Sequence, residues 1–187
     1  MPIALAVVFG LCAVAMIGIM VYFSCIDTET DLGSFERIIR FNDIWGTHRG
    51  FMWIRSIWIF GDASFIEKLF GVGPDMFYSA FSPYFDDLSK YGDSSTNAAH
   101  NEYLNYLITI GITGLLSYLA IVCGTIKNAV KYAKENPMLI ACVSAVICYA
   151  VQSVVNLYQP ITTPLFFIFI ALCEAFVRNA KAEKSAV

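Results

Sequence analysis

The sequence has little charge and almost no histidine. Among its 187 residues, 12 are lysine or arginine, 15 are aspartate or glutamate and two are histidine, whereas 58% are hydrophobic. Charged residues make up 14% of the chain, well below the ~25% that is typical of soluble domains. This composition excludes an ordinary soluble domain and predicts an integral membrane protein. The net charge of −3 indicates no particular partner.

The chain also lacks the usual motifs of metal and nucleotide sites. Its six cysteines show neither a zinc-ligand spacing nor a disulfide framework, so we interpret them as small apolar residues. The glycines at 71 and 73 lack both the third glycine of a dinucleotide motif and the Gly-Lys-Ser/Thr of a phosphate loop. Asp86, Asp87 and Asp93 are interpreted as a solvated acidic face. We expect no metal, no soluble cofactor and no nucleic-acid partner.

Long runs without charge are what the sequence does contain, at 1–26, 103–126 and 136–173. A membrane span needs about 20 apolar residues, so the first two runs predict one span each. The third predicts two spans joined by a turn around Pro160 and Pro164. The fold class predicted is an all-α integral membrane protein with about four transmembrane helices and a large extracytoplasmic loop that contains short interfacial helices. The predicted segments are a transmembrane helix at 1–25, the extracytoplasmic loop at 26–100, a transmembrane helix at 101–126, a cytoplasmic loop at 127–136, a transmembrane hairpin at 137–178 and a cytoplasmic tail at 179–187.

Lysines and arginines near the ends of the predicted spans set the expected orientation. They are Lys127, Lys131, Lys134, Arg178, Lys181 and Lys184. Because basic residues in short connections stay in the cytoplasm, the long loop is expected outside the cytoplasm. The first run has no basic segment and no cleavage pattern, which favours a retained helix over a removed leader.

One of the two histidines, His100, lies where the loop turns into a predicted span. We predict that Asn97 caps this helix and that His100 falls in its first turn. The positive end of the helix dipole there disfavours imidazolium, so a neutral imidazole can accept a proton and nearby N–H groups can bind phosphate. The alternative is an interfacial polar residue that only anchors the helix end.

The segment 36–58 combines all four arginines of the loop with all three tryptophans. An arginine-rich segment with aromatic residues lies at the headgroup level, where a planar guanidinium donates two parallel hydrogen bonds to phosphate. A lipid diphosphate is a natural ligand for such a segment. The arginines are Arg37, Arg40, Arg49 and Arg55. For any one of them, the alternative is simple pairing with Glu36, Asp43 or lipid headgroups.

The order of several motifs resembles the O-antigen ligase and O-antigen polymerase family. The motifs are Arg49 with Trp53, LFGVGP at 69–74, Phe77, HNEYL at 100–104 and GITGL at 111–115. The resemblance covers nearly the whole chain, since the hydrophobic end after PITTP at 160–164 also looks like that family's final hairpin. Members have further helices before the loop, so we expect the carboxyl-terminal part of a larger enzyme.

The resemblance implies a metal-independent glycosyltransferase of the outer face of the membrane. Its donor would be an undecaprenyl-diphosphate-linked glycan, and its acceptor another glycan or a lipid-linked acceptor, with membrane lipids as further partners. On this resemblance Arg49 binds the diphosphate and His100 lies near the acceptor hydroxyl, as the two catalytic residues. The substrate-binding candidates are Arg37, Arg40, Arg55, Asn101 and Tyr103.

A second hypothesis comes from a different functional class. In it the chain is a noncatalytic membrane protein, such as a transporter piece or an assembly subunit, and Gln152 and Asn156 line a polar path. Two amides near a helix end are weak support, because such groups commonly bond neighbouring helices.

Overall fold

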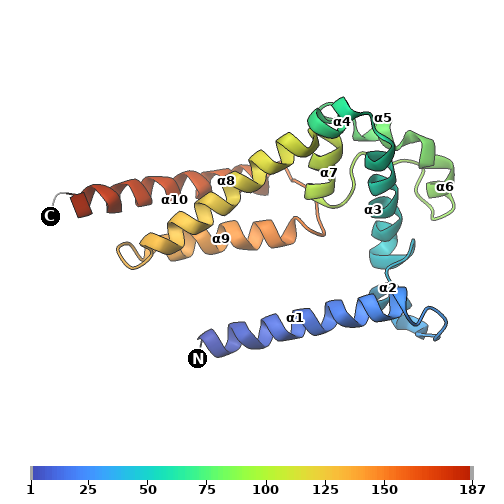
Figure 1. Cartoon of the computed structure of the whole chain (residues 1–187), viewed down its shortest axis with the longest axis horizontal. Coiled ribbons are helices and arrows are strands. Elements are labelled where there is room, and N and C mark those ends of the chain that lie inside the picture. Colours follow the sequence, from blue (N-terminus) through green and yellow to red (C-terminus); the bar gives the residue numbers. More distant parts are fainter. Residues whose placement is uncertain (1, 186–187) are drawn as a thin grey trace.

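The computed structural model describes the backbone of residues 2–185 and the side chains from residue 10 to residue 185. All the helix and strand structure in this range is helical, with no strand, as predicted (Figure 1). The helices are α1 (Pro2–Cys25), α2 (Glu36–Ile39), α3 (Trp45–Asp62), α4 (Phe65–Phe70), α5 (Phe77–Phe81), α6 (Phe85–Ser89), α7 (Glu102–Thr109), α8 (Gly111–Tyr132), α9 (Met138–Gln152) and α10 (Thr162–Ser185). Two short 3₁₀ turns lie at Gly33–Phe35 and Ser82–Tyr84.

Helices α8, α9 and α10 lie side by side as a bundle, and α3 runs across one end of it (Figure 1). Small residues such as Ala129, Cys142 and Cys173 are buried where the three helices meet. They allow a close approach of the backbones, as between helices in membranes. The interpretation of these two cysteines as small apolar residues is therefore confirmed. Helix α1 makes its main contacts with α2 instead of the bundle.

The loop between α1 and α7 has a hydrophobic core of its own. Phe51 and Met52 of α3 pack with Phe77 and Phe81 of α5, and Leu88, Ala99 and Ile108 complete the cluster. Phe81, Leu88 and Ala99 are fully buried. The short helices predicted for this loop are present as α2, α4, α5 and α6, and the loop also contains the longer α3, which this core fixes against the start of α7.

The helix predicted from 101 to 126 is wrong in two respects, because it breaks at Ile110 into α7 and α8, and because α8 continues to Tyr132, into the loop predicted at 127–136. The break exists because the segment after α4 packs onto it: the N–H of Val72 donates to the Ile108 carbonyl over 3.0 Å, and that of Gly73 to the Thr109 carbonyl over 2.9 Å. A β-carbon on Gly111, whose φ is +69°, would collide with the Leu69 carbonyl. The glycine motifs at 69–74 and 111–115 are thus two halves of one contact.

Length and composition make α8 a candidate membrane span, the one such helix among the described residues, while Gly10–Cys25 and α9 are apolar but shorter. The predicted turn around Pro160 does separate α9 from α10. Helix α10 extends to Ser185, so residues 179–185, predicted as a tail, continue the helix. The number of spans and their orientation stay predictions.

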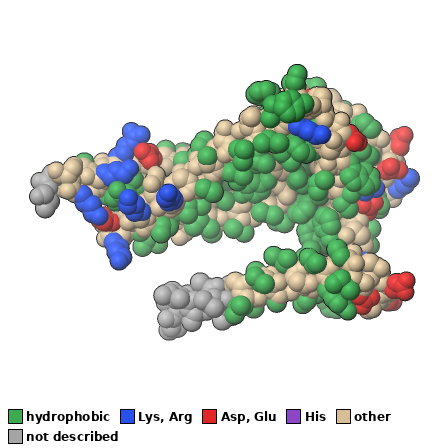
Figure 2. All heavy atoms as spheres, viewed as in Figure 1, with side chains coloured by type: hydrophobic (Ala, Val, Ile, Leu, Met, Phe, Trp, Pro, Cys, Tyr) green, Lys and Arg blue, Asp and Glu red, His purple; other side chains and the backbone are tan. Residues whose placement is uncertain are grey.

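Charge is unevenly distributed over the molecule. Figure 2 shows lysine and arginine side chains gathered at the bundle end that holds the carboxyl end of α10, with hydrophobic side chains covering the surface between them and the loop. Exposed apolar residues of this bundle include Leu116, Ile121, Val130 and Ile168. A lipid-facing surface has this apolar character.

Candidate active site

Arg49 and His100 line one cavity of about 380 Å³, together with Thr47, Met52 and Asp93. A neighbouring cavity of about 490 Å³ is also lined by Met52, Asp93 and His100, and extends toward Tyr78 and the 95–97 segment. Because three residues line both cavities, we treat them as one cleft, the Arg49–His100 cleft. The structure thus brings together the two residues predicted to be catalytic.

Arg49 lies at the start of a right-handed helix. The three residues before it, Gly46, Thr47 and His48, have left-handed φ values of 58°, 61° and 67°, so the regular part of α3 begins only at Arg49. The positive end of the helix dipole favours an anion there. A left-handed threonine is strained, and such strain concentrates at functional sites.

The Arg49 guanidinium has unused hydrogen-bonding capacity. Its Nη1 donates to the Gly46 carbonyl over 3.1 Å, whereas its buried Nε has no hydrogen-bond partner in the described part of the chain. No carboxylate there forms a salt bridge with it. A buried donor without a partner is costly, and a phosphate oxygen would satisfy it.

The predicted cap of α7 is wrong by four residues. Asn101, not Asn97, is the cap, because its Oδ1 accepts a hydrogen bond from the Leu104 N–H over 3.1 Å. His100 therefore lies just before the helix, in a left-handed conformation with φ +51°. Its imidazole is positioned by this turn and not by the first helical turn.

The His100 imidazole is half-buried and lies near charges of both signs. Burial is the main cause that lowers the pKa of His100 below its usual value of 6.5, and the positive charge of Arg49 lowers it further, while Asp93 acts in the opposite direction. The expected neutral imidazole is thus favoured by burial and by the positive charge of Arg49. A neutral imidazole in a cleft can accept a proton.

Arg40 and Arg55 are engaged in structural contacts. Arg40 donates to both oxygens of Glu36, over 2.8 and 2.9 Å, and to the carbonyls of Phe23, Asp27 and Thr30, which joins the end of α1 to the loop. Arg55 donates both ends of its fork to Asp43, over 2.6 and 2.9 Å, with its guanidinium over the rings of Phe51 and Trp58. Arg40 and Arg55 therefore form the ion pairs that were the alternative to phosphate binding.

The remaining substrate-binding candidates also lie outside the lining of the cleft. Arg37 is exposed on α2. Asn101 is buried as the cap of α7, and the Tyr103 hydroxyl donates to the Ala150 carbonyl over 2.7 Å. Asn101 and Tyr103 thus hold α7 in place.

Glu102 is a residue that the sequence analysis did not single out. Its side chain is fully buried. One carboxylate oxygen accepts from the Ser153 hydroxyl over 2.7 Å and the other from the Tyr106 hydroxyl over 2.8 Å. Its backbone N–H donates to the Ser153 carbonyl over 2.9 Å. This Glu102–Ser153 contact ties the residue after Asn101 to the end of α9. The sequence held one signal for Glu102, since it is a charged residue directly before the uncharged run at 103–126.

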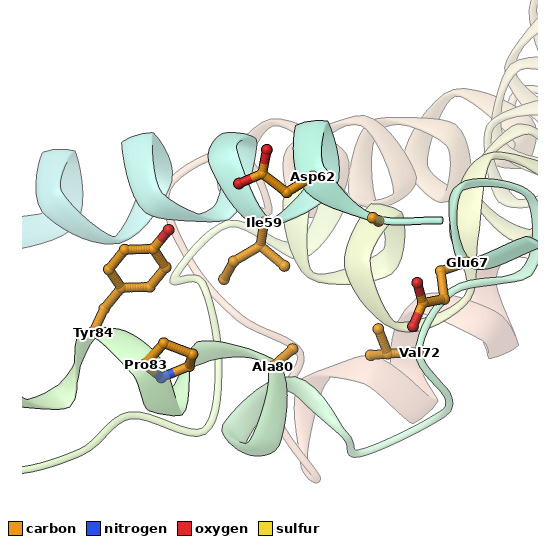
Figure 3. A pocket seen from close by; sticks show the side chains of 8 residues that line it. Ile59, Asp62, Glu67, Val72, Ala80, Pro83 and Tyr84 are labelled. Atoms are coloured by element: carbon orange, nitrogen blue, oxygen red, sulfur yellow. The ribbon is translucent and has the colours of Figure 1, made fainter. Parts of the chain in front are cut away.

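A further cavity of about 300 Å³ lies between α3, α4 and α5 (Figure 3). Figure 3 shows Ile59, Val72 and Ala80 along it, with the carboxylates of Asp62 and Glu67 nearby. Glu67 is held by the capping box with Ser64 at the start of α4. The charged side chains that line this cavity are negative, which disfavours a phosphate ligand.

A comparison with protein families bears on the two classes of function. The family model for O-antigen ligase matches residues 2–119, a span that contains both Arg49 and His100. The chain belongs to the O-antigen ligase family. This membership links it to cell-surface polysaccharide biosynthesis and to glycosyltransferase-type enzymes.

The matched span ends within α8, so the resemblance expected over nearly the whole chain is confirmed as far as residue 119. No curated protein and no solved structure matches this chain.

Proposed function

We propose that this O-antigen ligase-family chain transfers a glycan from undecaprenyl diphosphate to a hydroxyl group of a glycan or lipid-linked acceptor at the outer face of the cytoplasmic membrane. The observation that carries the proposal is the convergence of Arg49 and His100 on one cleft. Diphosphate binding and proton acceptance are the two functions that such a transfer needs from the protein.

Arg49 binds the diphosphate of the donor. Its guanidinium is free of carboxylate partners in the described residues, lies at a helix start and has a buried Nε without a partner. When the bond between the anomeric carbon and the phosphate oxygen breaks, the electron pair stays with the diphosphate. The positive charge and donors of Arg49 stabilise this added negative charge.

His100 accepts or orients the proton of the acceptor hydroxyl. The hydroxyl oxygen forms the new bond to the anomeric carbon, its proton passes to the neutral imidazole, and the polyprenyl diphosphate leaves. A direct displacement inverts the anomeric centre. The lowered pKa keeps His100 in the form that can take the proton.

The noncatalytic alternative receives less support from the polar residues on which it depended. Gln152 is exposed at the end of α9, and the Asn156 side chain accepts from the adjacent Leu157 N–H over 3.0 Å. Neither arrangement requires a polar path. Family membership also favours an enzyme.

The test is a transfer assay with the chain in liposomes, a polyprenyl-diphosphate-linked glycan as donor and separation of the product by gel. Arg49→Lys keeps the charge but loses the two-pronged donor, so we expect a strong loss of transfer. Arg37→Lys is the matched control, since Arg37 is exposed outside the cleft, and should transfer normally. Wild-type transfer by Arg49→Ala would show that Arg49 does not hold the diphosphate.

His100 is tested in the same assay. His100→Ala should lower turnover by the ~10²–10⁴-fold typical of a lost general base. Glutamine can orient a hydroxyl but cannot take its proton at neutral pH. Near-normal turnover in His100→Gln would therefore refute the base and leave an orienting role.

A further inference from the structure

A separate cavity of about 280 Å³ lies beside α7. It is lined from three parts of the chain: Asp75 comes from the segment after α4, Asn105 and Thr109 come from α7, and Tyr158 comes from the connection between α9 and α10. Neither Arg49 nor His100 lines it. Its volume is near the lower end of the ~300–1,000 Å³ that ligand pockets span, which suits one sugar ring.

Asn105 supplies this cavity with a hydrogen-bond donor. The side chain is 6% exposed, and its Oδ1 accepts from the Ala99 N–H over 3.4 Å. A backbone N–H can only donate, so the amide oxygen must face Ala99 and the NH₂ group points elsewhere. This NH₂ makes no hydrogen bond to the described residues, and it remains available to a ligand in the cavity.

Asp75 and Tyr158 supply an acceptor and an apolar ring face. Oδ1 of Asp75 accepts from the Tyr158 hydroxyl over 3.5 Å, and Oδ2 has no partner among the described residues. Asp75 has a left-handed backbone with φ +59° and lines the cavity. Tyr158 is 43% exposed, so its ring is open to contact.

These three groups match a neutral sugar better than any other part of the substrates. Sugar hydroxyls donate to a carboxylate and accept from an amide NH₂, and the C–H face of a sugar ring packs on an aromatic ring. The negative charge of Asp75 repels a phosphate. We propose that this cavity binds a neutral sugar residue of the glycan during transfer, as a subsite separate from the diphosphate site.

The subsite is coupled to the cleft through Asn105. The same side chain that offers its NH₂ to the sugar holds the N–H of Ala99, the residue directly before His100. A sugar bound in this cavity is therefore held in a fixed position relative to the His100 imidazole. The proposal rests on the proposed glycan transfer, and it adds the residues that recognise the glycan.

The test is ligand-observed saturation-transfer NMR with the chain in lipid nanodiscs. The probes are methyl glycosides of glucose, galactose and N-acetylglucosamine. Asp75→Asn and Tyr158→Ala should each weaken binding by about tenfold or more, in line with a lost hydrogen bond to a charged group or a lost ring contact. Asparagine tolerates the left-handed backbone at position 75, so the fold should survive. Asp86→Asn, at an exposed position of α6, is the control and should bind as the wild type does.

A second probe, geranyl diphosphate, separates this proposal from the proposed function. If Arg49→Ala abolishes diphosphate binding and Asp75→Asn leaves sugar binding unchanged, the sugar subsite is refuted and the role of Arg49 stands. If Asp75→Asn loses sugar binding and Arg49→Ala leaves diphosphate binding unaffected, the result supports the subsite and contradicts the role of Arg49. In the transfer assay, a raised KM for the acceptor or for the donor in Asp75→Asn would show which substrate supplies the sugar.

Discussion

The Glu102–Ser153 contact offers a direct test of what holds the start of α7. Replacing Ser153 by alanine removes the hydroxyl that donates to the buried Glu102 carboxylate over 2.7 Å, and it leaves the backbone bond between the two residues in place. We expect Ser153→Ala to destabilise the protein, because a fully buried carboxylate oxygen loses its donor.

The magnitude follows from the geometry. A hydrogen bond to a charged group contributes ~1.5–3 kcal/mol, so Ser153→Ala should lower the free energy of unfolding by about 2 kcal/mol. For a protein of this size, each kcal/mol corresponds to ~2–4 °C in Tm. The expected decrease is therefore roughly 4–8 °C. Glu102→Ala should cost more, because it leaves the hydroxyls of both Ser153 and Tyr106 without their acceptor.

Thermal unfolding in detergent, followed by tryptophan fluorescence, measures this change. Ser144→Ala is the matched control, since Ser144 is an exposed serine of α9, the helix that Ser153 directly follows, and its hydroxyl only donates to the Ile140 carbonyl. We expect its Tm to stay close to that of the wild type. A Ser153→Ala protein with the same Tm as Ser144→Ala would refute the view that this contact anchors α7.

Two further predictions concern the pH profile and the topology. Transfer should fall as the pH drops through the His100 pKa, which lies below 6.5, because protonation removes the base. Asp93 raises that pKa, so Asp93→Asn should move the acidic limb of the rate-against-pH profile to lower pH. An acidic limb that does not move in this variant would contradict the coupling between Asp93 and His100. In a variant without the native cysteines, a cysteine at Ser94 should be labelled from outside, whereas cysteines at Lys131 or Lys184 should be labelled only after permeabilisation; the reverse pattern would overturn the predicted orientation.

The helical elements were largely predictable because they depend on local properties of the chain. Uncharged runs and the prolines around residue 160 predicted the long helices and the turn before α10. The break at Ile110 was not predictable, because it depends on the segment at 69–74 packing against residues distant in sequence. The uncharged run from 103 to 126 predicted one continuous helix there, and the contact with the 69–74 segment breaks it.

The site was predictable in its residue types but not in its local geometry. Motif order selected Arg49 and His100, and the structure brings both to one cleft. Ser94, Asn97 and Asn101 are all residue types that cap helices, so composition could not select the correct one. The pair of Arg40 with Glu36 has the ordinary four-residue helical spacing, whereas the partner of Arg55, Asp43, is set by the way the loop folds back onto α3.

Strain on both sides of the cleft explains why its geometry depends on the loop core. Thr47 and His48 before Arg49, and His100 before α7, all have left-handed backbones, at a cost of ~1–3 kcal/mol for each such residue. Packing of Phe51 on α3 within the cluster that includes Ala99 offsets this cost and holds both helix starts at the cleft. A substitution that loosens this core therefore releases the strain first at Arg49 and His100, and it should reduce transfer before it unfolds the bundle of α8, α9 and α10.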